Sequence, residues 1–77
     1  MKVTEAFRER VQTHWQSPGQ VAWEAMDELF RHNEELSLDH DDQVKYALRI
    51  GILVGETKKE NPESFIDRFE KEILNEE

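Results

Sequence analysis

The chain has 77 residues, enough for one small domain, and a lone domain of this size buries only a modest part of its surface. Its 18 acidic residues outnumber its 10 Lys and Arg, and a net charge of −8 argues against nonspecific nucleic-acid binding, which requires clustered cations. The absence of cysteine excludes disulfide scaffolds, thiolate zinc sites, iron–sulfur clusters and cysteine nucleophiles, and it fits a reducing, cytoplasmic setting.

Two segments bear on export and membrane insertion. The chain begins with MKVTEAFRER, which is charged from the start and lacks the apolar run of a signal peptide. The most apolar segment, YALRIGILVG at residues 46–55, is about half the length needed to cross a bilayer. We therefore expect a cytoplasmic protein that is neither exported by a signal peptide nor inserted in a membrane.

A first amphipathic helix is predicted over roughly residues 3–16. The segment SPGQ ends it, because Ser17 can cap the next helix, Pro18 suits a first helical position and Gln20 can complete a capping box. The apolar side chains of this first helix recur every four residues: Val3, Phe7, Val11 and Trp15.

The second predicted helix has an apolar face and an acidic face. Its core-facing side chains are Ala22, Ala25, Met26 and Leu29. Three residues form a flank with the composition typical of interface anchors: Trp23, Met26 and Phe30. Acidic residues are predicted to form an exposed ridge on the opposite side, including Glu24, Asp27 and Glu28.

The third predicted helix contains the apolar segment and follows the loop ELSLDHDD, in which Ser37 or Asp39 can cap it. A strand is the alternative, but the length of the run and the lack of a second strand to pair with favour a helix. Apolar or small residues occupy most of its circumference, so we expect burial on nearly all sides, with Leu48 and Ile52 in the core. Gly55 can end this helix in the left-handed conformation.

Small residues recur every four positions on the third helix, at Ala47, Gly51 and Gly55, and form a ridge that another helix could approach closely. The simpler alternative is that this ridge packs against other helices of the same chain. If the helices of one chain do not cover it, the ridge is a candidate site for a second copy or for a partner protein.

The fourth predicted helix begins at NPES, with Asn61 as cap and Pro62 in the first position. Its apolar stripe consists of Phe65, Ile66, Phe69 and Ile73. The sequence therefore predicts an all-α fold, a small compact bundle of about four helices with a central apolar third helix, in which residues 1–77 form a single helical domain.

No motif indicates catalysis, a cofactor or a metal. The three histidines, His14, His32 and His40, occur in no zinc, di-iron or calcium pattern. The serines stand where helix capping explains them, and no nucleophile elbow or phosphate loop is present. We expect no catalytic residue, no cofactor and no metal site.

These observations favour a small acidic noncatalytic regulator, an inhibitor or adaptor that binds the basic or apolar surface of another protein, or a second copy as a homodimer. The candidate partner-binding residues are Trp23, Met26, Phe30, Ala47, Gly51, Gly55, Glu24, Asp27 and Glu28. One alternative is an inhibitor that mimics nucleic acid and occupies the groove of a DNA- or RNA-binding protein. A small metal-binding protein or enzyme is the third alternative. No partner is expected among nucleic acids or membranes.

Overall fold

A computed structural model describes residues 2–74, apart from the side chain of Glu35, and within that range it contains helices and no strand. The predicted all-α fold is therefore confirmed. Four main helices are joined by a short helix α3, and a π-helical turn η1 continues α5. The elements are α1 (Glu5–Thr13), α2 (Pro18–Arg31), α3 (Asn33–Leu36), α4 (His40–Thr57), α5 (Pro62–Arg68) and η1 (Phe69–Ile73).

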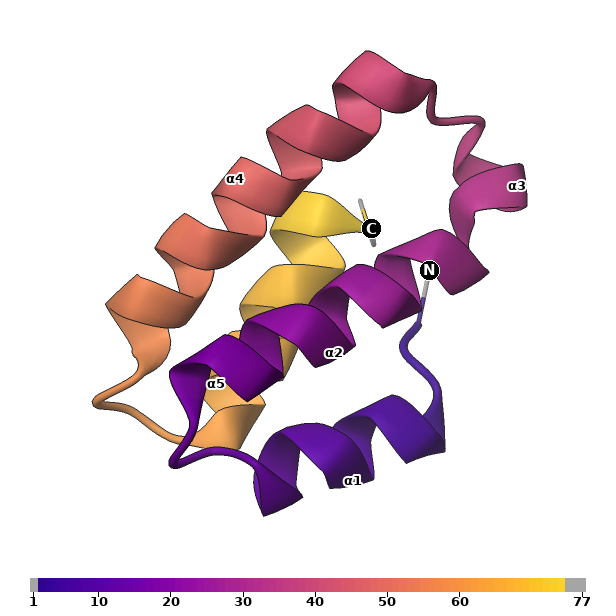
Figure 1. The fold of residues 1–77 in the computed structure, drawn as a ribbon. Helices are drawn as coiled ribbons and strands as arrows, with labels where there is room; N and C mark the ends of the chain where they lie inside the picture. Colours follow the sequence, from indigo (N-terminus) through magenta and orange to yellow (C-terminus); the bar gives the residue numbers. More distant parts are fainter. Residues whose placement is uncertain (1, 75–77) are drawn as a thin grey trace.

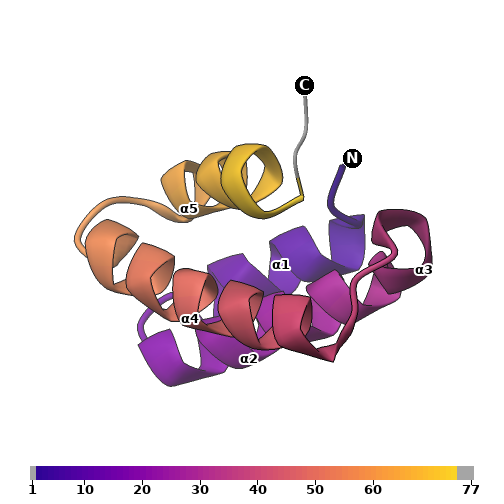
Figure 2. The same ribbon diagram turned by 90° about the horizontal axis from the view of Figure 1, so that it is seen from above.

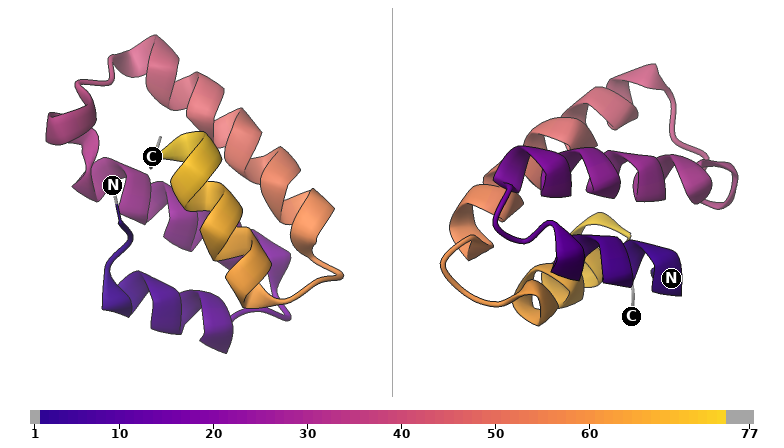
Figure 3. Two further views of the ribbon diagram at one scale, coloured as in Figure 1. Left: turned by 180° about the vertical axis from the view of Figure 1, so that it is seen from behind. Right: turned by 60° about the horizontal axis from the view of Figure 1, so that its bottom comes forward.

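The helices form two layers. α2 and α4 lie side by side and run in opposite directions across one face of the molecule (Figure 1). α5 and η1 cross behind them, and the view from above shows these two elements as a separate layer (Figure 2). Seen from behind, α5 lies in front of both α2 and α4 (Figure 3, left), while α1 packs against α2 and α5.

One apolar core lies between the two layers. Three of its rings are in contact, since Phe69 lies 5.2 Å from Phe7 and 5.9 Å from Phe65 between ring centroids. Trp15 adds a fourth ring, whose centroid lies 6.0 Å from that of Phe65. The buried apolar residues are Phe7, Val11, Val21, Ala25, Leu29, Ile50, Leu53, Val54, Phe65, Ile66, Phe69, Ile73 and Leu74.

Local capping signals set most helix starts. The side chain of Asp39 accepts a hydrogen bond from the Asp42 amide at 2.8 Å, and that of Asn61 accepts one from the Ser64 amide at 2.9 Å, which confirms both caps. The capping box at Ser17 is wrong. Ser17 makes no side-chain cap bond.

Two further details differ from the sequence prediction. α4 continues through Gly55 to Thr57 with no glycine at positive φ, so Gly55 does not end the helix. The predicted loop ELSLDHDD overlaps the end of the short α3 and the start of α4, and α3 ends at Ser37 in the left-handed conformation with φ of 54°. Leu36 and Leu38 pack this connection against the core.

Candidate functional site

The outward side of α4 is not covered by any other element of residues 2–74. Leu48 is 66% exposed, Ile52 62% and Val44 48%. The expectation that α4 is buried on nearly all sides, with Leu48 and Ile52 in the core, is therefore wrong. The physical reason is that α2, α5 and η1 pack against one side of α4, where Ile50 and Leu53 are buried.

α2 extends this exposed surface with two aromatic side chains. Trp23 is 67% exposed and Phe30 49%. At 100° per residue they project about 20° apart, opposite the buried stripe that faces the core. Seen from behind, α5 lies in front of α2 and α4 (Figure 3, left), so the sides of these two helices that point away from α5 belong to one face of the molecule. We call this surface the α2–α4 apolar face, made of Trp23, Phe30, Val44, Leu48 and Ile52.

The predicted ridge of small residues lies at this face. Gly51 and Gly55 are exposed, and a Cβ placed on either would have no heavy atom of the rest of the protein within 4 Å. Ala47 and Met26 are half-buried, and Met26 packs against the core. The glycines therefore do not serve close packing within the chain, so the simpler alternative for this ridge does not hold.

The predicted acidic ridge of α2 is only partly exposed. Glu24 and Glu28 are 9% and 1% exposed, whereas Asp27 is exposed. The expectation that Glu24 and Glu28 lie on the surface is wrong, because α1 and the segment before it cover them. Arg10 approaches Glu24 at 3.6 Å.

The buried carboxylate of Glu28 binds the segment that precedes α1. Its oxygens accept hydrogen bonds from the Thr4 amide at 2.7 Å and from the Thr4 hydroxyl at 3.1 Å, and His32 Nε2 lies 3.3 Å away. Glu70, also buried, accepts a bond from the Val3 amide at 3.0 Å. These contacts are structural, since they satisfy backbone and hydroxyl groups instead of facing solvent.

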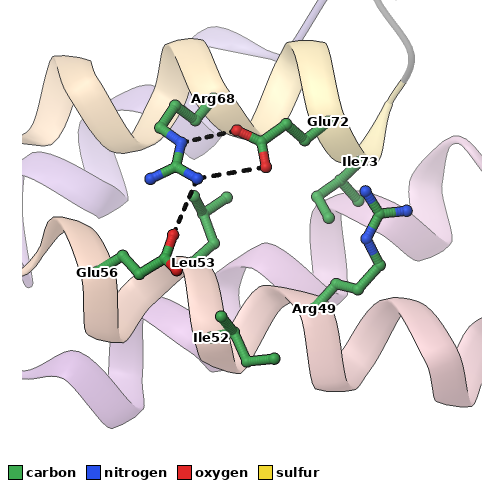
Figure 4. Close-up of a pocket in the computed structure, with 7 residues that line it drawn as sticks. All are labelled: Arg49, Ile52, Leu53, Glu56, Arg68, Glu72 and Ile73. Atoms are coloured by element: carbon green, nitrogen blue, oxygen red, sulfur yellow. Dashed lines mark hydrogen bonds and ion pairs between the residues drawn. The ribbon is translucent and has the colours of Figure 1, made fainter.

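A shallow cleft of about 230 Å³ lies between α4 and α5 beside Ile52 (Figure 4). Arg68 crosses its wall and donates to Glu72 at 2.7 Å and to Glu56 at 2.9 Å. The hydrogen bond from Arg68 holds the pKa of Glu72 below its ordinary value, against a smaller opposing effect of desolvation, and the charge of Arg49 lowers it further. The same bonds to Glu72 and Glu56 raise the pKa of Arg68.

The acidic side chains of this cleft, Glu56 and Glu72, are both paired with Arg68. Among residues 2–74, the side chains that line it include no histidine and no hydroxyl group. Within residues 2–74, no group of three or more potential ligands is placed to hold a metal ion. Over the same range, no helix has the length and apolar character required to span a bilayer.

Comparisons of the chain with protein-family models, with curated proteins and with solved structures found no match. The assignment of the α2–α4 apolar face as the candidate site therefore rests on the structure alone. Of its residues, Trp23 and Phe30 were among the predicted partner-binding residues, and Leu48 and Ile52 were wrongly assigned to the core. One signal in the sequence could have identified them. α4 is apolar around most of its circumference, and three other helices with one apolar stripe each cannot cover all of it.

Proposed function

We propose that this protein acts without catalysis, by binding another polypeptide through the α2–α4 apolar face, as an inhibitor, adaptor or other regulator. The observation that supports the proposal is the exposure of five large apolar side chains on two adjacent helices. Single exposed hydrophobic residues are common on protein surfaces, whereas several large ones on one face of two neighbouring helices are typical of an interaction surface.

The area of the face supports the same conclusion. From their exposed fractions, the five side chains present on the order of 500 Å² of apolar surface, near the upper end for the largest patch of a typical monomer. Trp23 is the most exposed of them, and tryptophan is enriched among residues that dominate binding energy. Covering the face removes this area from water, which favours association.

Mimicry of nucleic acid receives less support from the side-chain placements. Such a mimic needs carboxylates that face the target, whereas Glu24, Glu28 and Glu70 are buried. Arg68 also partly neutralises Glu56 and Glu72 on the surface. We therefore assign the main contact to apolar side chains. The net charge of −8 keeps the protein soluble and steers its encounter with a partner.

Site-specific photo-crosslinking tests the proposal. A benzophenone side chain replaces Leu48 in the face, and in a matched control it replaces Asp67, which is exposed on α5. Both proteins are irradiated in lysate of the native host. We expect discrete polypeptide adducts from position 48 that are absent at position 67. The adducts should persist in about 0.5 M NaCl, because apolar contacts are not screened by salt.

Competition provides the control for specificity. Excess unlabelled protein should suppress the adducts, whereas the double variant Leu48→Glu/Ile52→Glu should not. The variant is expected to fold, because both side chains are mainly exposed. Equal adducts from positions 48 and 67, or equal competition by the double variant, would refute the proposed function.

A further inference from the structure

The outward stripe of α4 has an ordered charge pattern along its length. Asp41 is exposed in the first turn, and Lys59 is exposed in the turn that directly follows the helix. At 100° per residue, Asp41 projects within about 20° of Leu48 and Ile52, and Lys59 follows the helix beyond them at its other end. One apolar stripe thus has an acidic start and a basic end.

We propose that the polypeptide covering the α2–α4 apolar face is a second copy of this chain. The two α4 helices pack antiparallel through their outward stripes, and the two-fold axis passes between them at the height of residue 50. This inference rests on the proposed function and names its partner. In this register Leu48 of each copy meets Ile52 of the other. Asp41 of each copy then meets Lys59 of the other, so both ends of the stripe are paired with opposite charge.

The flank of the stripe is complementary in the same register. Lys45 and Glu56 are both exposed and project about 20° apart on one side of Leu48 and Ile52, and Glu56 also accepts a hydrogen bond from Arg68 of its own chain. A two-fold axis between antiparallel helices brings the same flank of each helix together, so Lys45 of one copy lies beside Glu56 of the other. A parallel pair about a two-fold axis would instead place Asp41 against Asp41 at one end of the stripe and Lys59 against Lys59 at the other, which is repulsive.

The other flank allows close approach. Gly51 and Gly55 lie on that side with open space around them, so they would let the two helix axes come nearer than larger residues allow. Trp23 is exposed on the neighbouring helix α2 and would extend the contact at its edge. The glycines assist the contact, while the large apolar side chains and the charge order select the second copy and its direction.

The area indicates a weak dimer. A symmetric contact that covered all five side chains of the face in both copies would bury on the order of 1,000 Å² in total, which is at the lower limit for specific interfaces. We therefore expect a dissociation constant of roughly 1–100 µM. Each copy carries a net charge of −8, so the two copies repel at long range, and salt that shortens the screening length to about 8 Å should strengthen association.

Sedimentation equilibrium of the full chain tests the inference at concentrations from about 5 to 500 µM in about 0.15 M NaCl. We expect a reversible transition from the 9.2 kDa monomer to a dimer. Leu48→Glu should weaken association at least tenfold. The control Ala6→Glu adds the same charge at an exposed position on α1 and should leave it within about twofold of the original. Circular dichroism confirms that each variant is folded.

A charge-exchange cycle tests the direction of the helices. Asp41→Lys and Lys59→Asp each place like charges together at both ends of the antiparallel pair, and each should weaken association about threefold to tenfold. The double variant Asp41→Lys/Lys59→Asp restores opposite charges and should recover most of the lost affinity. Additive losses in the double variant would overturn the antiparallel register.

The result for the second copy can be separated from that for the proposed function. A chain that stays monomeric to about 500 µM overturns this inference. If position 48 then still gives specific adducts with a different polypeptide, the proposed function stands with another partner. If position 48 gives no specific adduct either, both are refuted. Dimerisation that is indifferent to Leu48→Glu also overturns the inference, because the contact then lies elsewhere.

Discussion

Replacing Leu48 by Ala and Ile50 by Ala removes apolar atoms two positions apart on α4, from opposite sides of the helix. Ile50 is 0% exposed, whereas Leu48 is 66% exposed. Both substitutions introduce the same good helix former, so changes in helix propensity contribute little to the difference. The comparison therefore isolates which side of α4 is covered.

The expected losses of unfolding free energy differ severalfold. Truncating a fully buried Ile costs about 2–5 kcal/mol, because apolar contacts are lost and a cavity remains. Burying a whole Leu side chain is worth about 1.5–3 kcal/mol, and Leu48 buries about a third of its surface, so its truncation should cost about 0.5–1 kcal/mol. A chain of 77 residues has a total stability of about 4–12 kcal/mol, so only Ile50→Ala removes a large part of it.

Urea denaturation followed by circular dichroism measures both values, at a few micromolar protein so that association contributes little. Ile50→Ala should lower the denaturation midpoint strongly with an unchanged slope, and Leu48→Ala should lower it slightly. A loss above about 2 kcal/mol for Leu48→Ala, together with a small loss for Ile50→Ala, would show that α4 is rotated and that its outward stripe is the core.

Three further predictions concern single groups. Gly51→Ala should raise the unfolding free energy by up to about 1 kcal/mol, seen as a thermal midpoint a few degrees higher, because the position is helical with open space around it; a lower midpoint would contradict that openness. Glu28→Gln should cost about 1–3 kcal/mol and speed hydrogen exchange at the Thr4 amide, which donates to this buried carboxylate; unchanged exchange would show that the bond is absent in solution. Because the pKa of Glu72 is lower in the folded state, its bond to Arg68 should contribute stability that is fully present above its ordinary value of 4.5 and lost as pH falls through the folded value. Carboxyl NMR titration checks the direction of this shift, and Glu72→Gln should remove that part of the acid dependence.

The net charge was a poor guide to where carboxylates lie. Glu24, Glu28 and Glu70 are buried, although nothing in their local sequence separates them from exposed glutamates. Each accepts a hydrogen bond or ion pair from another element or turn, and Glu28 and Glu70 reach the segment before α1. Such pairings connect residues far apart in the chain, so helical periodicity does not reveal them.

Much of the candidate surface was predictable, but its extent was not. The interface composition of Trp23 and Phe30 and the spacing of Gly51 and Gly55 pointed to a contact surface, and all four are exposed. The exposure of Leu48 was not predicted. An apolar side chain on a helix is assigned to the core unless the helix is recognised to carry a second apolar stripe. Whether these residues bind a partner remains a prediction.

The sequence by itself determined the helical class, the main helices and two of their caps, because periodicity and capping act within a few residues along the chain. Asn61 and Asp39 show this directly, since each bonds an amide three positions away. Only the tertiary structure decided which stripe of α4 is covered, because burial depends on the number and direction of the helices packed against it. α2, α5 and η1 cover the side of Ile50 and leave the side of Leu48 to solvent.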